Sequence, residues 1–79
     1  MQAKVYVSLK KGVLDPQGKT VHHALSSLGF KGVQDVRIGK YMEIGLEEGS
    51  REEAEKTVTA MCEKLLANTV IEDYRVEID

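Results

Sequence analysis

Apolar and polar residues alternate at both ends of the chain. Every second residue between positions 3 and 9 is apolar, and the same alternation returns between positions 74 and 78. A period of two is typical of a strand that buries one face. The pattern therefore predicts a strand at each end, and the expected inward residues are Ala3, Val5, Val7, Leu9, Tyr74, Val76 and Ile78.

Two amphipathic helices are predicted between these strands. The first starts at Asp15-Pro16, because Asp is a good N-cap and Pro suits the first turn, and it stops at Gly29. The second starts at Ser50, which forms a capping box with Glu53. Helical spacing predicts two buried stripes, which are Val21, Ala24, Leu25 and Leu28 in the first helix and Ala54, Val58, Met61, Cys62 and Leu65 in the second.

The stretch from residue 33 to residue 47 has an extended pattern that leaves two interpretations open. Val36 and Ile38 have the same parity as Met42 and Ile44, on the other side of Gly39-Lys40. Gly39-Lys40 either forms a two-residue hairpin turn or lies inside one long strand that is kinked or bulged there. A hairpin gives four strands within one chain, whereas a long strand can pair with a second molecule.

Every predicted element has one apolar side, which favours an α+β fold. We expect two helices packed on one face of an antiparallel sheet, in the order β-α-β(β)-α-β of ferredoxin-like proteins. The 79 residues predict a single domain spanning residues 1–79. A chain of this length buries a small core, and with one Cys it has no internal disulfide. Self-association would supply further stability, so we expect a homo-oligomer.

Charge and hydropathy argue against several classes of partner. The 11 Lys and Arg residues nearly balance the 13 Asp and Glu residues, which disfavours binding to nucleic acid. We expect no association with membranes, because no apolar run is long enough to cross one. The chain enters a strand without a signal-peptide pattern, and it has a single Cys. Both features favour a reducing cytoplasm.

We predict no catalytic residue and no metal site in this chain. His22 and His23 are adjacent, so on a rigid helix they point in different directions and cannot share one metal ion. Cys62 falls on the apolar stripe, where a thiol has a raised pKa and is inert. We therefore interpret the histidines as polar helix residues and the cysteine as part of the core.

Two short segments are candidates for contact with a partner protein. The helix-entry loop presents an apolar and an amide side chain on a rigid turn, although turn chemistry alone also explains much of it. A second segment combines two cations with a glycine, and its alternatives are a solvated strand, a partner contact and a small phosphate-facing cluster. The candidate residues are Leu14, Asp15, Pro16, Gln17 and Gly18 in the loop, and Arg37, Gly39 and Lys40 in the second segment.

Two tyrosines are candidates for self-association. Tyr6 and Tyr41 fall on the polar side of their strands. Exposed aromatic residues on a sheet occur in RNA-binding domains, but the RNP1 consensus is absent and the chain is acidic overall. Tyr is enriched at protein–protein interfaces, so we expect another protomer to cover this face.

The order of these motifs resembles that of the PurS family. The relevant segments are Leu14-Asp15-Pro16-Gln17-Gly18, Leu28-Gly29-Phe30, Val36-Arg37-Ile38-Gly39-Lys40 and the run from Met61 to Arg75. The resemblance covers essentially the whole chain without a long insertion. PurS is the small, non-catalytic subunit of phosphoribosylformylglycinamidine synthase, an ATP- and glutamine-dependent ligase of de novo purine synthesis.

The resemblance implies a set of partners and a role. It implies a homo-oligomer, dimer or tetramer, in which a long central strand is shared between protomers. It also implies a complex with a large synthetase subunit, which uses ATP and magnesium, and with a glutaminase subunit that releases ammonia. The small subunit would bridge the two and help ammonia to pass, and it would hold no cofactor of its own.

Two other functions are compatible with the predicted fold. An acylphosphatase needs an anion cradle and an Arg after the first strand, but the segment here is Lys10-Lys11-Gly12-Val13. A small dimeric regulatory module that binds an amino acid fits the expected sheet, because a fold does not decide a function. No ligand-specific motif in the sequence favours the regulatory module.

Overall fold

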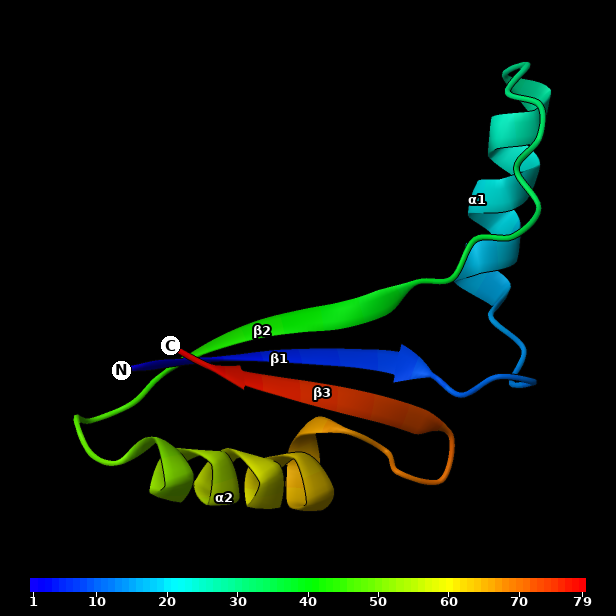
Figure 1. Ribbon diagram of the computed structural model, residues 1–79. Coiled ribbons are helices and arrows are strands. Elements are labelled where there is room, and N and C mark those ends of the chain that lie inside the picture. The colour runs from blue at the N-terminus through cyan, green and yellow to red at the C-terminus, as the bar shows by residue number, and fades with distance from the viewer.

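The computed structural model describes all residues from 1 to 79 and confirms an α+β chain with an antiparallel sheet (Figure 1). Three strands form the sheet, one helix covers it, and a second helix projects from its end. The elements in chain order are β1 (Gln2–Leu9), α1 (Pro16–Ser27), β2 (Gly39–Gly45), α2 (Arg51–Met61), the π-helical turn η1 (Cys62–Leu66) and β3 (Glu72–Ile78).

The first strand lies at the centre of the sheet. The strand order is β2-β1-β3, and both neighbours run antiparallel to β1. Val5 lies opposite Met42 on one side and opposite Val76 on the other. The two terminal strands are therefore direct partners, which brings the ends of the chain together (Figure 1).

One face of the sheet packs against α2 and forms the core. Val5, Val58 and Cys62 are completely buried, and the inward residues predicted for both terminal strands are buried or half-buried. Ser50 caps α2, because its hydroxyl accepts a hydrogen bond from the backbone N–H of Glu53 at 3.0 Å, whereas the reciprocal bond of a capping box, from the Ser50 N–H to the Glu53 side chain, does not form. The predictions for the two terminal strands are therefore confirmed. The buried stripe predicted for the second helix is confirmed from Ala54 to Cys62.

The prediction for Leu65 is wrong. Its side chain is 82% exposed, and Ala67 takes the buried position instead. The cause is the π-helical turn, in which the N–H of Ala67 bonds to the carbonyl of Cys62 five residues earlier. Because its hydrogen bonds span five residues and not four, a π turn rotates each residue through a smaller angle about the helix axis than an α turn does. The Leu65 side chain is therefore directed away from the sheet.

The prediction that α1 packs on the sheet is also wrong. The helix leaves the end of β1 and points away from the sheet, and residues 31–38 return beside it (Figure 1). We call residues 15–38 the arm. On its predicted buried stripe, Val21 is 38% exposed and Leu28 is 74% exposed. The radius of gyration is 16.0 Å, whereas a compact domain of this length has about 12 Å.

The physical reason lies at the base of the arm. The Asp15 carboxylate binds the start of α1 and also the backbone of Ile38, so the returning segment follows α1 and not the sheet. Residues 33–38 form no strand, and β2 begins at Gly39. The hairpin alternative is therefore wrong, because the chain passes straight through Gly39-Lys40 into β2. The expected strand over residues 33–47 is therefore reduced to β2, Gly39–Gly45.

Gly39 must be a glycine for steric reasons, which a paired substitution tests. An added Cβ would lie 2.4 Å from the carbonyl oxygen of Val7, whereas at Gly45, in the same strand, it would meet nothing within 4 Å. We expect Gly39→Ala to lower the melting temperature clearly and Gly45→Ala to change it little. Thermal unfolding of both variants followed by circular dichroism measures this. Equal melting temperatures would contradict the steric assignment.

Candidate functional site

The helix-entry loop and Arg37 of the second predicted contact segment lie at the base of the arm. Asp15 is only 5% exposed. One carboxylate oxygen accepts a hydrogen bond from the N–H of Gly18 at 2.8 Å, and the other accepts one from the N–H of Ile38 at 2.7 Å. The first bond is the predicted N-cap. The second joins residues 23 positions apart, which the sequence did not predict.

These hydrogen bonds favour the ionised form of Asp15. The N–H of Ile38, then that of Gly18, and to a smaller extent the positive charge of Arg37 lower the pKa of the carboxyl below its ordinary value of 3.8. Partial burial opposes them without reversing the direction. The Asp15 side chain is therefore a charged structural link at neutral pH and is unsuited to proton transfer there.

Gly18 and His22 hold the returning segment against α1. A Cβ on Gly18 would lie 2.1 Å from the carbonyl oxygen of Val36, so only glycine permits this approach. The His22 Nε2–H donates to the carbonyl oxygen of Val33 at 2.7 Å. His22 is thus a half-buried link between two segments of the arm, whereas the sequence indicated a polar surface residue.

The exposed part of the helix-entry loop is formed by Leu14, Pro16 and Gln17. Leu14 is 62% exposed, and the other two side chains are exposed as well. Asp15 and Gly18 point into the arm and are buried. The predicted candidate loop therefore divides into a structural half and a half that is available for contact.

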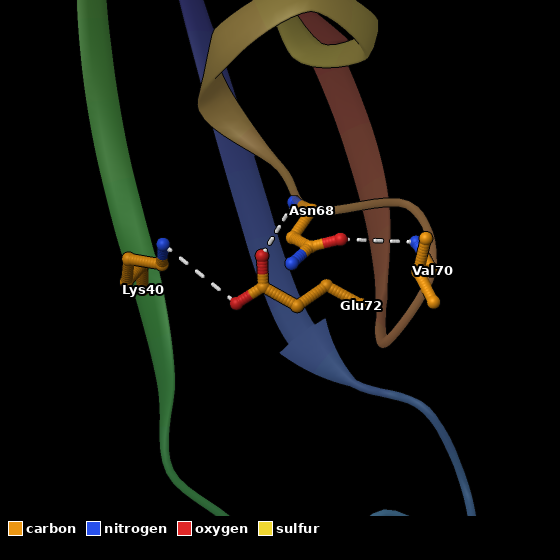
Figure 2. Close-up of polar contacts among 4 residues, drawn as sticks. All are labelled: Lys40, Asn68, Val70 and Glu72. Atoms are coloured by element: carbon orange, nitrogen blue, oxygen red, sulfur yellow. Dashed lines mark hydrogen bonds and ion pairs between the residues drawn. The ribbon is translucent and has the colours of Figure 1, made fainter.

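The two cations of the second segment have separate partners. Arg37 donates from Nη2 to the carbonyl oxygen of Lys10 at 3.2 Å. Lys40 lies 3.7 Å from the carboxylate of Glu72, on the far side of β1 (Figure 2). Gly39 lies between them, against the backbone of β1. The structure therefore places Arg37 in the base of the arm and Lys40 in a different contact.

Through Glu72, Lys40 contacts a hydrogen-bonded turn at residues 68–72, which the sequence analysis did not identify. The N–H of Asn68 donates to Glu72 at 2.7 Å, and the N–H of Val70 donates to the Asn68 side-chain oxygen at 3.2 Å (Figure 2). Val70 is 81% exposed at the outside of this turn. The only signal in the sequence was Asn68, whose side chain often bonds the backbone two residues on.

Tyr6 and Tyr41 lie side by side on the face of the sheet opposite α2. Their ring centroids are 5.1 Å apart, and the Arg75 guanidinium lies 4.1 Å from the centre of the Tyr6 ring. Tyr6 donates to Glu77 at 3.1 Å, and Tyr41 donates to Glu43 at 2.8 Å. The bond to Glu43 raises the pKa of Tyr41 to about 12. No element of the chain covers this ordered aromatic and ionic face (Figure 1).

The structure brings together no catalytic or metal-binding constellation. Cys62 is completely buried, and burial raises the pKa of its thiol. No three His, Cys, Asp or Glu side chains are grouped so that they could hold a metal ion. None of the helices has the length and apolar character needed to cross a membrane.

Comparisons with known proteins point to one family. Residues 2–79 match the family model described as PurS, phosphoribosylformylglycinamidine (FGAM) synthase. The phosphoribosylformylglycinamidine synthase subunit PurS of Bacillus subtilis is 62% identical over 78 residues, which cover 99% of this chain and 92% of that protein.

Solved structures give the same result. A PurS structure from Methanocaldococcus jannaschii has a TM-score of 0.89 at 45% identity, covering 99% of this chain and 94% of that one. A chain in the structure of PurLQS from Thermotoga maritima has a TM-score of 0.83 at 32% identity, covering 98% and 96%. The similarity thus extends over the arm as well as the sheet.

The lowered pKa of Asp15 predicts a specific dependence of stability on pH. Because the folded-state pKa lies below the unfolded-state value, this group stabilises the fold fully above about pH 4, and the contribution is lost as the pH falls through the folded-state pKa. Asp15→Asn should therefore melt lower than the wild type at neutral pH, and the two melting temperatures should converge in acid.

Melting temperatures measured between neutral pH and about pH 2 test this. Glu77→Gln is the control, because the pKa of Glu77 is also lowered, by its bonds from Tyr6 and Arg75, but Glu77 does not touch the arm. A constant difference between wild type and Asp15→Asn down to the lowest pH would contradict the role of the ionised carboxylate.

Proposed function

The chain belongs to the PurS family of phosphoribosylformylglycinamidine synthase subunits, and from this we propose that it is the non-catalytic assembly subunit of that enzyme. The observation that carries the proposal is similarity over the whole chain, including similarity to a chain of the PurLQS structure. The enzyme converts formylglycinamide ribonucleotide to formylglycinamidine ribonucleotide with ATP and glutamine, in de novo purine biosynthesis.

In this role the chain bridges a large synthetase subunit and a glutaminase subunit and assists the transfer of ammonia between them. ATP and magnesium act on the synthetase subunit, and this chain holds no cofactor. The rigid base of the arm and the exposed half of the helix-entry loop support such a role, because assembly needs fixed surfaces and no catalytic group. The complex would work in the cytoplasm.

Self-association is the second part of the proposal. The arm exposes Val21 and Leu28 on one side of α1, whereas its other side is covered by residues 33–38. In the sheet, α2 contacts β3, and the inward residues Met42 and Ile44 of β2 remain half-exposed. If two copies exchange arms, the exposed side of α1 in each copy covers the half-exposed part of the sheet in the other.

A substitution on the arm tests this exchange. Leu28→Glu places a charge on the exposed apolar side of α1, so we expect it to convert the homo-oligomer into monomers. His23→Glu, an exposed position of the same helix outside the apolar stripe, is the matched control and should leave the oligomer intact. Sedimentation or light scattering gives the mass of each. Unchanged mass for Leu28→Glu would contradict the exchange.

The proposed function itself is tested by reconstitution. Purified synthetase and glutaminase subunits should show glutamine-dependent synthase activity only when this chain is added, and the chain alone should show none. Equal activity of the two larger subunits without it would overturn the assembly role. A thermal-shift screen with amino acids would then test the regulatory module.

The exposed half of the helix-entry loop gives a residue-level prediction. Gln17→Ala should weaken formation of the complex while the melting temperature of the isolated chain stays the same, because the Gln17 side chain is exposed. Thr59→Ala, at an exposed position of α2, serves as control. Titration of each variant into the two larger subunits measures the affinity. An unchanged affinity for Gln17→Ala would leave Gln17 as a turn residue.

A further inference from the structure

Charge is divided unequally between the arm with its base and the rest of the molecule. Residues 10–40 contain six cations and two carboxylates, whereas residues 41–79 contain four cations and eleven carboxylates. The near-neutral total of the chain conceals this difference. The cations of residues 10–40 lie along the arm, at its base and at the start of β2, and the arm leaves the sheet at the end of β1 (Figure 1).

Three of these cations gather where the arm leaves the sheet. Lys10 and Lys11 follow β1, and Arg37 reaches the carbonyl oxygen of Lys10 at 3.2 Å. None of the three forms an ion pair within the chain, since the ion pairs of the chain involve other residues. We call Lys10, Lys11, Leu14 and Arg37 the basal surface, because the exposed side chain of Leu14 adjoins these cations in the chain.

The carboxylates in this region offset only part of the charge of the basal surface, because the charged Asp15 interacts with Arg37 and neither Lys10 nor Lys11 forms an ion pair. Asp15 is buried, and its two oxygens already accept backbone hydrogen bonds. Glu72 has a side chain only 14% exposed and faces Lys40. Asp35 is the exposed carboxylate between residues 10 and 40, and it pairs with none of the three cations. The remaining positive charge, on Lys10 and Lys11 above all, is therefore available to a partner.

The basal surface is also rigid. The Asp15 carboxylate fixes the loop and residue 38, and the N–H of Lys10 donates to the carbonyl oxygen of Ile71 at 2.8 Å. Because its backbone is already ordered, docking there loses little conformational entropy. An apolar side chain among cations that form no ion pair matches a partner that combines an apolar contact with carboxylates.

We propose that the basal surface binds an acidic segment of another subunit of the synthase complex. In this contact Lys11 and Arg37 face carboxylates of the segment, and Leu14 contacts one of its apolar side chains. This inference rests on the proposed assembly role. A two-fold contact of the basal surface with its own copy would place cations against cations. That repulsion favours a different subunit as the occupant.

The test compares charge reversals of equal size at two places. Lys11→Glu with Arg37→Glu reverses the basal surface, and Arg51→Glu with Lys56→Glu makes the same change at exposed positions of α2. Affinity for the mixture of synthetase and glutaminase subunits is measured at low and high salt. We expect the basal variant to bind at least about tenfold more weakly, and wild-type affinity to fall with salt.

Two further measurements keep the outcomes distinct. The first is the single variant Lys11→Glu. The Lys11 side chain is exposed, so this variant changes the charge of the basal surface and keeps the hydrogen bond between Arg37 and Lys10. Equal affinity of the basal variant and the wild type, or equal weakening by the α2 variant, would overturn the inference. A change in homo-oligomer mass without loss of subunit binding would also overturn it, since the occupant would be a second copy. Failure of the wild type to bind would instead refute the assembly role.

Discussion

The two hydrogen bonds to the Asp15 carboxylate determine the shape of this molecule. One caps α1, and the other fixes residue 38, just before β2 begins. Both donors are backbone N–H groups and the acceptor is a buried charge, which makes these bonds stronger than neutral ones. Because the two ends of the arm meet at one carboxylate, the arm leaves the sheet as a single unit (Figure 1).

The chain is extended and leaves several apolar and aromatic surfaces exposed. Its core consists of one sheet face and α2, and small residues such as Ala3 and Ala54 contribute much of it. The arm exposes an apolar stripe, the open sheet face presents an ordered layer of Tyr6, Tyr41 and Arg75, and the turn before β3 exposes Val70. Burial of these surfaces in an assembly would stabilise such a molecule, which agrees with membership of a family of synthase subunits.

Local rules predicted local structure, and they failed where a distant contact decided the outcome. Alternation placed the terminal strands correctly, and Asp15 and Ser50 cap the helices as their residue types indicate. The stripe of α1 was correctly recognised as apolar, but periodicity does not say whether the same chain covers it. The Asp15–Ile38 bond and the π turn that exposes Leu65 depend on tertiary packing, and no short sequence motif predicts either of them. Turn chemistry explains Asp15, Pro16 and Gly18, and the contact role of Leu14 and Gln17 stays a prediction.

Amide hydrogen exchange of the isolated chain and of the assembled complex tests whether Asp15 holds the arm together. We expect the N–H groups of Gly18 and Ile38 to be protected in the isolated chain, because Asp15 accepts hydrogen bonds from both. We also expect the helical amides of α1 to gain protection on assembly and those of β1 to change little. Rapid exchange at Ile38, or an arm whose protection is the same before and after assembly, would contradict these expectations.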